Sequence, residues 1–171
     1  MDIPRNEEDV RTLEAIFEVD QQAIRDFRAG RINEAGLAQV NKEHVDIIRR
    51  IISRAGFPTI DSTSRKAYKA AVLIVLHSDD LELLNQSIQA LTNAQPASIE
   101  KKDIGYMVDK ARLAQNLPQV YGTQYKIGPS GAVEFIEIED PADLDKRRAE
   151  LGMGSFSEYR KMAEGYEKGA I

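Results

Sequence analysis

The sequence predicts a mainly α-helical fold, a single-domain bundle of about six or seven helices with one small β-hairpin near residues 119–139. Three observations support this fold. Apolar residues recur at helical spacing through most of the chain, capping residues and glycines separate the helical stretches, and a glycine-rich turn joins two short runs late in the chain. The 171 residues fit one domain, which we expect to span residues 1–171.

The first two predicted helices are long and amphipathic. The first follows Asn6, carries acidic residues in its first turn and ends at Gly30. The second begins at the capping residue Asn33 and stops at Gly56, shortly before a proline. Each helix has one apolar stripe, which we expect to pack against the rest of the bundle.

The third helix, expected at about residues 65–77, is the most apolar part of the chain. Between Ala70 and Leu76 it is apolar on nearly every side. A helix of that kind is buried on all its faces, because no polar side is left for solvent. We therefore place residues 70–76 at the centre of the core.

The remaining elements are short and end at recognisable signals. Two runs, residues 119–127 and 132–139, flank the glycine-containing turn at residues 128–131 and predict the hairpin. The other helices are expected to start at capping residues or a proline, namely Asp79 or Asp80 for the fourth, Ser98 for the fifth, Asp140-Pro141 for the sixth and the capping box Ser155–Glu158 for the last.

Composition excludes several classes of protein. The chain has no cysteine, so disulfides and thiolate metal sites are ruled out. No apolar run approaches the roughly 20 residues of a membrane span. The net charge of −5, with interspersed signs, argues against a nucleic-acid partner. The first residues lack the apolar core of a signal peptide, so we expect a cytoplasmic protein with neither a metal nor a tightly bound cofactor.

His77 is the first candidate for chemistry. It ends the most apolar helix and is followed by Asp79 and Asp80. A histidine at a buried helix end titrates near neutral pH, and a carboxylate can orient its ring. The alternative is structural, with His77 making one hydrogen bond at the helix end and Asp79 capping the next helix.

A second group of polar residues lies elsewhere in the chain. Tyrosine, threonine and glutamine surround a glycine in the segment Tyr121–Gln124, which suits close contact with a ligand but also suits entry into a strand. Four further polar candidates lie within predicted helices, namely Asp20, Gln21, His44 and Asp109. Polar residues within helices usually face solvent, so exposure is the default interpretation for them. Arg148 belongs to a charged cluster that most simply forms surface ion pairs.

Several segments together resemble a known family. They are, in order, Gly56-Phe57-Pro58, His77-Ser78-Asp79, Tyr106-Met107-Val108-Asp109, Tyr121-Gly122-Thr123-Gln124, Asp140-Pro141 and Asp145-Lys146-Arg147-Arg148. This order resembles an uncharacterised family of small bacterial helical proteins with Gly-Trp-Pro, Gln-His-Ala-Asp and Tyr-Gly-Thr-Gln motifs and an Asp-Arg pair. The resemblance covers roughly residues 20–162 and implies site residues without implying a reaction.

The chain departs from that pattern at a few positions. Leu76 stands where the family has a glutamine, Phe57 where it has a tryptophan, and His44 where an asparagine is usual. Lys110 replaces an arginine, and lysine cannot make the planar bidentate contacts of a guanidinium. If the family binds an anion through that arginine, we expect this chain either to bind another ligand or to have lost the activity.

Two functions remain open from sequence. The first is an enzyme that performs hydrolysis or group transfer on a small polar molecule by acid–base chemistry. In it, His77 is the acid or base, Asp79 or Asp109 orients its ring, and the substrate is polarised by Tyr121 and Gln124. Ligand binding would involve Asp20, Gln21, His44, Lys110, Thr123 and Arg148. The second is a non-catalytic ligand-binding or protein-interaction protein, of a regulatory or antitoxin-like kind, with a protein as its partner.

Overall fold

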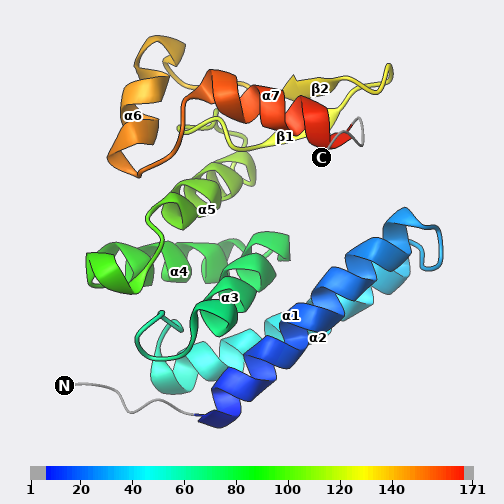
Figure 1. The fold of residues 1–171 in the computed structure, drawn as a ribbon, viewed down its shortest axis with the longest axis vertical. Coiled ribbons are helices and arrows are strands. Elements are labelled where there is room, and N and C mark those ends of the chain that lie inside the picture. Colours follow the sequence, from blue (N-terminus) through cyan, green and yellow to red (C-terminus); the bar gives the residue numbers. More distant parts are fainter. Residues whose placement is uncertain (1–6, 168–171) are drawn as a thin grey trace. The chain divides into compact units, whose positions relative to one another are not determined.

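A computed structural model describes residues 7–167, so the predicted capping residue Asn6 lies outside the described part. The described residues form seven α-helices and one two-stranded hairpin, which confirms the mainly helical prediction (Figure 1). The chain divides into two compact units, residues 1–99 and residues 100–171. A compact unit is not by itself an independently folding domain, so the expectation of a single domain stays a prediction.

The N-terminal unit is built on a long antiparallel pair of helices, α1 and α2, which follow one another through a short turn (Figure 1). Helix α1 contacts both α2 and α3, and α3 also contacts α4. None of the described helices has the length and apolar character needed to cross a membrane. The elements of this unit are α1 (Glu7–Arg28), α2 (Glu34–Ala55), α3 (Arg65–His77), α4 (Leu81–Asn93) and the short 3₁₀ helix η1 (Pro96–Ser98).

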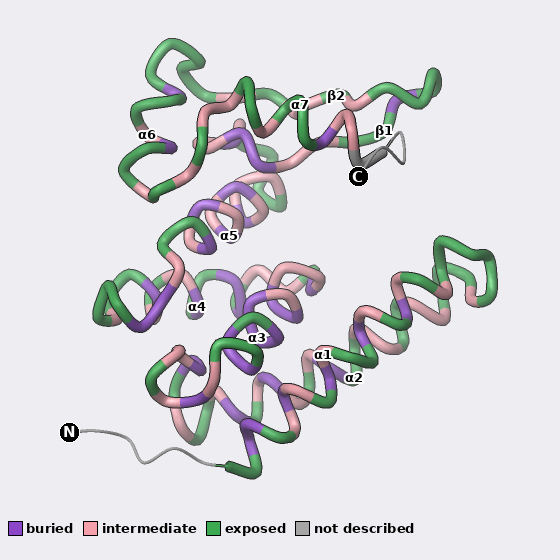
Figure 2. The backbone as a smooth tube through the Cα atoms, viewed as in Figure 1, coloured by how far each residue is buried: buried purple, intermediate pink, exposed green. Residues whose placement is uncertain are grey.

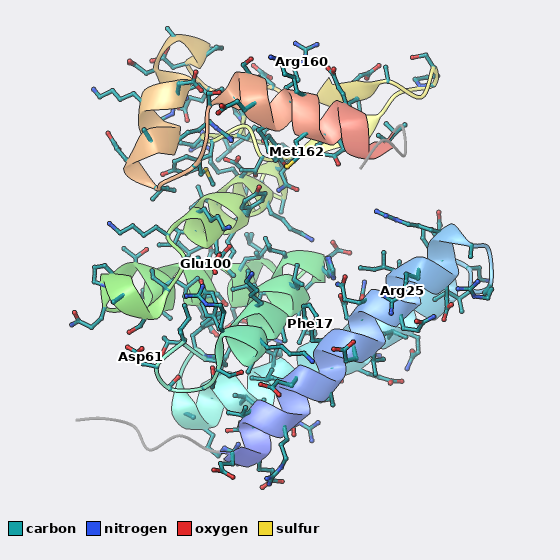
Figure 3. All side chains as sticks on the ribbon, viewed as in Figure 1. Phe17, Arg25, Asp61, Glu100, Arg160 and Met162 are labelled. Carbon is teal, nitrogen blue, oxygen red and sulfur yellow. The ribbon has the colours of Figure 1, made fainter. Side chains whose placement is uncertain are left out.

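Helix α3 forms the centre of this unit, as its apolar sequence predicts. Tyr68, Ala71 and Val75 are fully buried, and Val72 is only 4% exposed. Figure 2 shows buried positions along α3. At the first turn of α3, the Lys66 ammonium lies 5.8 Å from the centre of the Phe17 ring on α1 (Figure 3). The burial of α3 fixes the position of its last residue, His77.

Side-chain caps begin three of the helices in this unit. Asn33 accepts a hydrogen bond from the Gly36 amide, and Ser64 accepts one from the Ala67 amide, both at 3.0 Å. Of the two aspartates predicted to cap α4, Asp80 does so. The prediction that Ser98 caps the fifth helix is wrong. Its hydroxyl instead donates to Asp61, because the backbone first forms η1.

The C-terminal unit combines a small hairpin with three helices. Its strands pair antiparallel, with Tyr125 opposite Phe135 and Ile127 opposite Val133. Both strands are shorter than predicted. The first begins only at Tyr125 because Gly122 adopts a left-handed φ of 63° and turns the chain before it. The elements are α5 (Lys102–Leu113), β1 (Tyr125–Ile127), β2 (Val133–Phe135), the 3₁₀ helix η2 (Pro141–Asp143), α6 (Leu144–Glu150) and α7 (Phe156–Glu167).

Candidate functional site

A buried carboxylate holds the ring of His77. Oδ1 of Asp20, on α1, lies 3.1 Å from Nδ1 of His77 at the end of α3. The Asp20 side chain is only 4% exposed, whereas that of His77 is 31% exposed. The second carboxylate oxygen of Asp20 accepts a hydrogen bond from the side-chain amide of Gln21 at 3.1 Å. Asp20, which the sequence analysis placed among the ligand-binding residues, is therefore a carboxylate partner of His77.

His44 lies beside this pair and is buried, so the default expectation that it is exposed is wrong. Among the residues that the structure describes, its Nδ1 is the one buried side-chain nitrogen or oxygen atom without a hydrogen-bond partner. Burial lowers the pKa of His44, the charges of Asp20 and Glu43 oppose that shift, and His77 adds to it. His44 is thus kept neutral next to the carboxylate.

His77 also lines a pocket of about 570 Å³, which belongs entirely to the N-terminal unit. One wall comes from α2, and the rest comes from the end of α3, the following loop and the start of α4. Pockets of roughly 300–1,000 Å³ are typical for small-molecule ligands. Its lining residues are Ala38, Asn41, Lys42, Val45, His77, Ser78, Asp79, Asp80 and Leu81, which we call the His77 pocket.

Two polar residues of the His77 pocket already form hydrogen bonds within the protein. The Ser78 hydroxyl donates to the Val75 carbonyl at 2.7 Å. Asp80 accepts from the Leu83 amide and from the Arg49 guanidinium. Burial alone would raise the pKa of the Asp80 carboxyl, but these donors outweigh it and hold the pKa below its usual value. Asp80 is therefore a compensated anion. The neighbouring Asp79 is exposed to solvent.

In the C-terminal unit, Asp109 is fully buried and organises the loop before β1. Its Oδ1 accepts hydrogen bonds from the Val120 and Tyr121 amides at 2.7 and 2.9 Å. Its Oδ2 accepts from the amide and the hydroxyl of Thr123, both at 2.9 Å. Four donors from one short segment converge on a single carboxylate, so Asp109 sets the shape of residues 120–123.

Other buried side chains complete this loop, and sequence reasoning missed some of them. Gln119 is fully buried and donates to the carbonyls of Gln124 and Ile136 at 2.9 and 2.7 Å. Arg148 is 3% exposed and donates to the Tyr121 carbonyl at 2.7 Å, so its expected role in a surface ion pair is wrong. Further hydrogen bonds to loop carbonyls come from Arg147 and Tyr159.

The remaining predicted residues of this unit lie on or beside the same loop. The side-chain amide of Gln124 donates to the Thr123 hydroxyl at 3.0 Å. Tyr121 is half-buried, and burial followed by the nearby Asp109 charge raises the pKa of its phenol. Lys110 is half-buried on α5, next to Asp109 in sequence. Tyr121, Thr123 and Gln124 therefore belong to one structural group around Asp109.

Residues 7–168 match the family of unknown function DUF6624. The chain belongs to this family. The match includes every candidate residue named above and spans both compact units. No curated protein and no solved structure matches the chain. Membership of this family therefore assigns no reaction to the site. The geometry of the site is the basis for its chemistry.

The structure thus gathers the predicted site residues into two groups. Asp20, Gln21, His44 and His77 come together from three helices of the N-terminal unit, with Asp79 on the wall of the same pocket. Asp109, Thr123, Gln124 and their neighbours form the loop of the C-terminal unit. The hypothesis that His77 and Asp79 share a pocket with Asp109, Tyr121 and Gln124 joins residues of both units and stays a prediction.

Histidine and acidic side chains, which are common metal ligands, lie near one another in this cluster. Among residues 7–167, no three histidine or acidic side chains are arranged so that they could hold a metal ion. The partner of His77 Nδ1 is instead a carboxylate oxygen at hydrogen-bond distance. Proton chemistry is therefore the property of this cluster that the geometry supports.

The first prediction concerns the bond between Asp20 and His77. His77→Ala should lower the free energy of unfolding by about 1–3 kcal/mol, because it leaves a buried carboxylate oxygen without its donor. His77→Asn should retain most of the stability, since its amide can donate from nearly the position of Nδ1. Urea unfolding of both variants measures the difference, and equal stabilities for the alanine variant and the wild type would contradict the bond.

The second prediction concerns Asp109. Asp109→Ala removes the acceptor of three backbone amides and one hydroxyl, so it should cost about 3 kcal/mol or more. Faster hydrogen exchange at the amides of residues 120, 121 and 123 should accompany the loss. Asp143→Ala, at an exposed aspartate of η2, is the control. A loss no larger than that of the control would show that Asp109 does not organise the loop.

Proposed function

We propose that the chain is a small enzyme that uses His77 for acid–base chemistry, in hydrolysis or group transfer on a small polar molecule. The observation that carries this proposal is the 3.1 Å contact between His77 Nδ1 and the buried Asp20 carboxylate, at the wall of a pocket of about 570 Å³. A partly exposed histidine that is oriented by a buried carboxylate is the arrangement that a general base requires.

The hydrogen bond determines which ring nitrogen can react. The Asp20 oxygen is an acceptor, so the Nδ1 of neutral His77 carries the proton and Nε2 has the free lone pair. When Nε2 takes up a proton, the ring becomes a cation, and the buried carboxylate beside it stabilises that charge. Gln21 donates to the other oxygen of Asp20 and holds the carboxylate in place.

A complete proton cycle follows from this geometry. Nε2 removes a proton from a water molecule or a substrate hydroxyl, and that oxygen forms a bond to the electrophilic carbon of the substrate. Collapse of the intermediate breaks the bond to the leaving group, which takes the proton back from Nε2. His77 is neutral at the start and at the end, and the cycle needs no cofactor.

The rest of the pocket supports binding of a small molecule. Asn41 and Lys42 add polar groups from α2, and Ala38, Val45 and Leu81 add apolar surface. A mixed wall of this kind orients a polar ligand while excluding part of its water. We place the protein in the cytoplasm, a location with which the absence of cysteine is consistent.

The third prediction tests the base with the neutral ester p-nitrophenyl acetate. The wild type should hydrolyse it faster than the same concentration of free imidazole does. His77→Asn should reduce the protein-dependent rate by about 100-fold or more, because general acid–base catalysis is typically worth that factor. Asp20→Asn should also slow the reaction, since it removes the carboxylate that stabilises the imidazolium.

A matched control is Asp46→Asn, which removes an exposed carboxylate from α2 outside the pocket. It should leave the rate unchanged. His77→Asn retains His44, so any remaining rate reports reaction at that ring or at the surface. A His77→Asn rate equal to that of the wild type would contradict the proposal.

A further inference from the structure

The charges around the His77 pocket are unevenly compensated. Lys42 lines the pocket on α2 and is exposed. Within residues 7–167 its ammonium makes no ion pair. Asp80, by contrast, is compensated by Arg49 and by the first turn of α4. The pocket therefore contains one cation whose charge is available to a ligand.

The same pocket also disfavours ligands with a high negative charge. Asp79 adds an exposed carboxylate to its lining, and the compensated Asp80 lies next to it. A second negative charge on a ligand would be repelled by these groups, because unit charges about 4 Å apart interact by several kcal/mol near a protein surface. A hydroxyl or amino group is favoured there instead, since it can donate a hydrogen bond to a carboxylate.

We propose that the His77 pocket binds a small carboxylate with a single negative charge and a neighbouring hydroxyl or amino group. The carboxylate lies at Lys42, the donor group faces Asp79, and the bond to be broken is presented to His77. This inference rests on the proposed function and names the class of its substrate. Lys42 is here a binding residue, and Asp79 determines specificity.

Three small probes separate these contributions. Glycolate has both the carboxylate and the hydroxyl, acetate lacks the hydroxyl, and glycolamide lacks the charge. Binding is measured from chemical-shift changes of pocket residues in NMR titrations at constant ionic strength, because salt screens such contacts. Glycolate should bind most tightly, and glycolamide about tenfold or more weakly, as expected for loss of a charge-assisted hydrogen bond.

Variants of Lys42 and Asp79 test which side chain contributes to glycolate binding and which to the preference over acetate. Lys42→Met keeps the aliphatic stem and removes the charge, so glycolate should bind it about tenfold more weakly, whereas Lys42→Arg should restore binding. Asp79→Asn should reduce the preference for glycolate over acetate. The control is Lys66→Met, which removes a lysine at the opposite end of α3. It should bind glycolate like the wild type.

The proposal is overturned if glycolate does not bind, if glycolamide binds as tightly as glycolate, or if Lys42→Met binds glycolate like the wild type. These failures are distinct from a failure of the acid–base proposal. The ester used to test His77 carries no charge, so its hydrolysis does not depend on recognition of an anion. A loss of ester hydrolysis in His77→Asn together with equal binding of the three probes would support the acid–base proposal and contradict this substrate class.

Discussion

The hydrogen bond between Asp20 and His77 joins α1 to the end of α3, and the proposed function depends on it. A carboxylate that is 4% exposed is costly to bury unless donors surround it. Here the donors are the His77 ring and the Gln21 amide. The same contact that makes the buried charge tolerable also orients the ring and leaves Nε2 for reaction.

The C-terminal unit shows how the choice of donors decides what a buried aspartate does. Asp109 is even more buried than Asp20, but its partners are backbone amides and one hydroxyl, which do not titrate near neutral pH. Its contacts therefore stabilise a loop and offer no proton. The partner of Asp20 is an imidazole ring, so under the proposed function its contact serves acid–base chemistry as well as stability.

The helices could be predicted because their signals are local. The caps at Asn33 and Asp80 and the apolar run in α3 each lie within a few residues of the feature they specify. Burial of the polar residues was harder to foresee, although Asp20 lies four residues after buried Ile16, on the same helical face. Polar residues on such a stripe are usually taken as exposed, and only the packing of α1 against α3 shows that Asp20 meets His77.

The protonation state of the His77 ring tests the central claim most directly. Long-range ¹H–¹⁵N NMR spectra of the wild type, recorded with the ring in its neutral form, distinguish its two neutral tautomers. A hydrogen bond from Nδ1 to Asp20 predicts a proton on Nδ1 and a free lone pair on Nε2, with loss of this preference in Asp20→Asn. A wild-type ring protonated on Nε2 would contradict both the hydrogen bond and the role of His77 as a base.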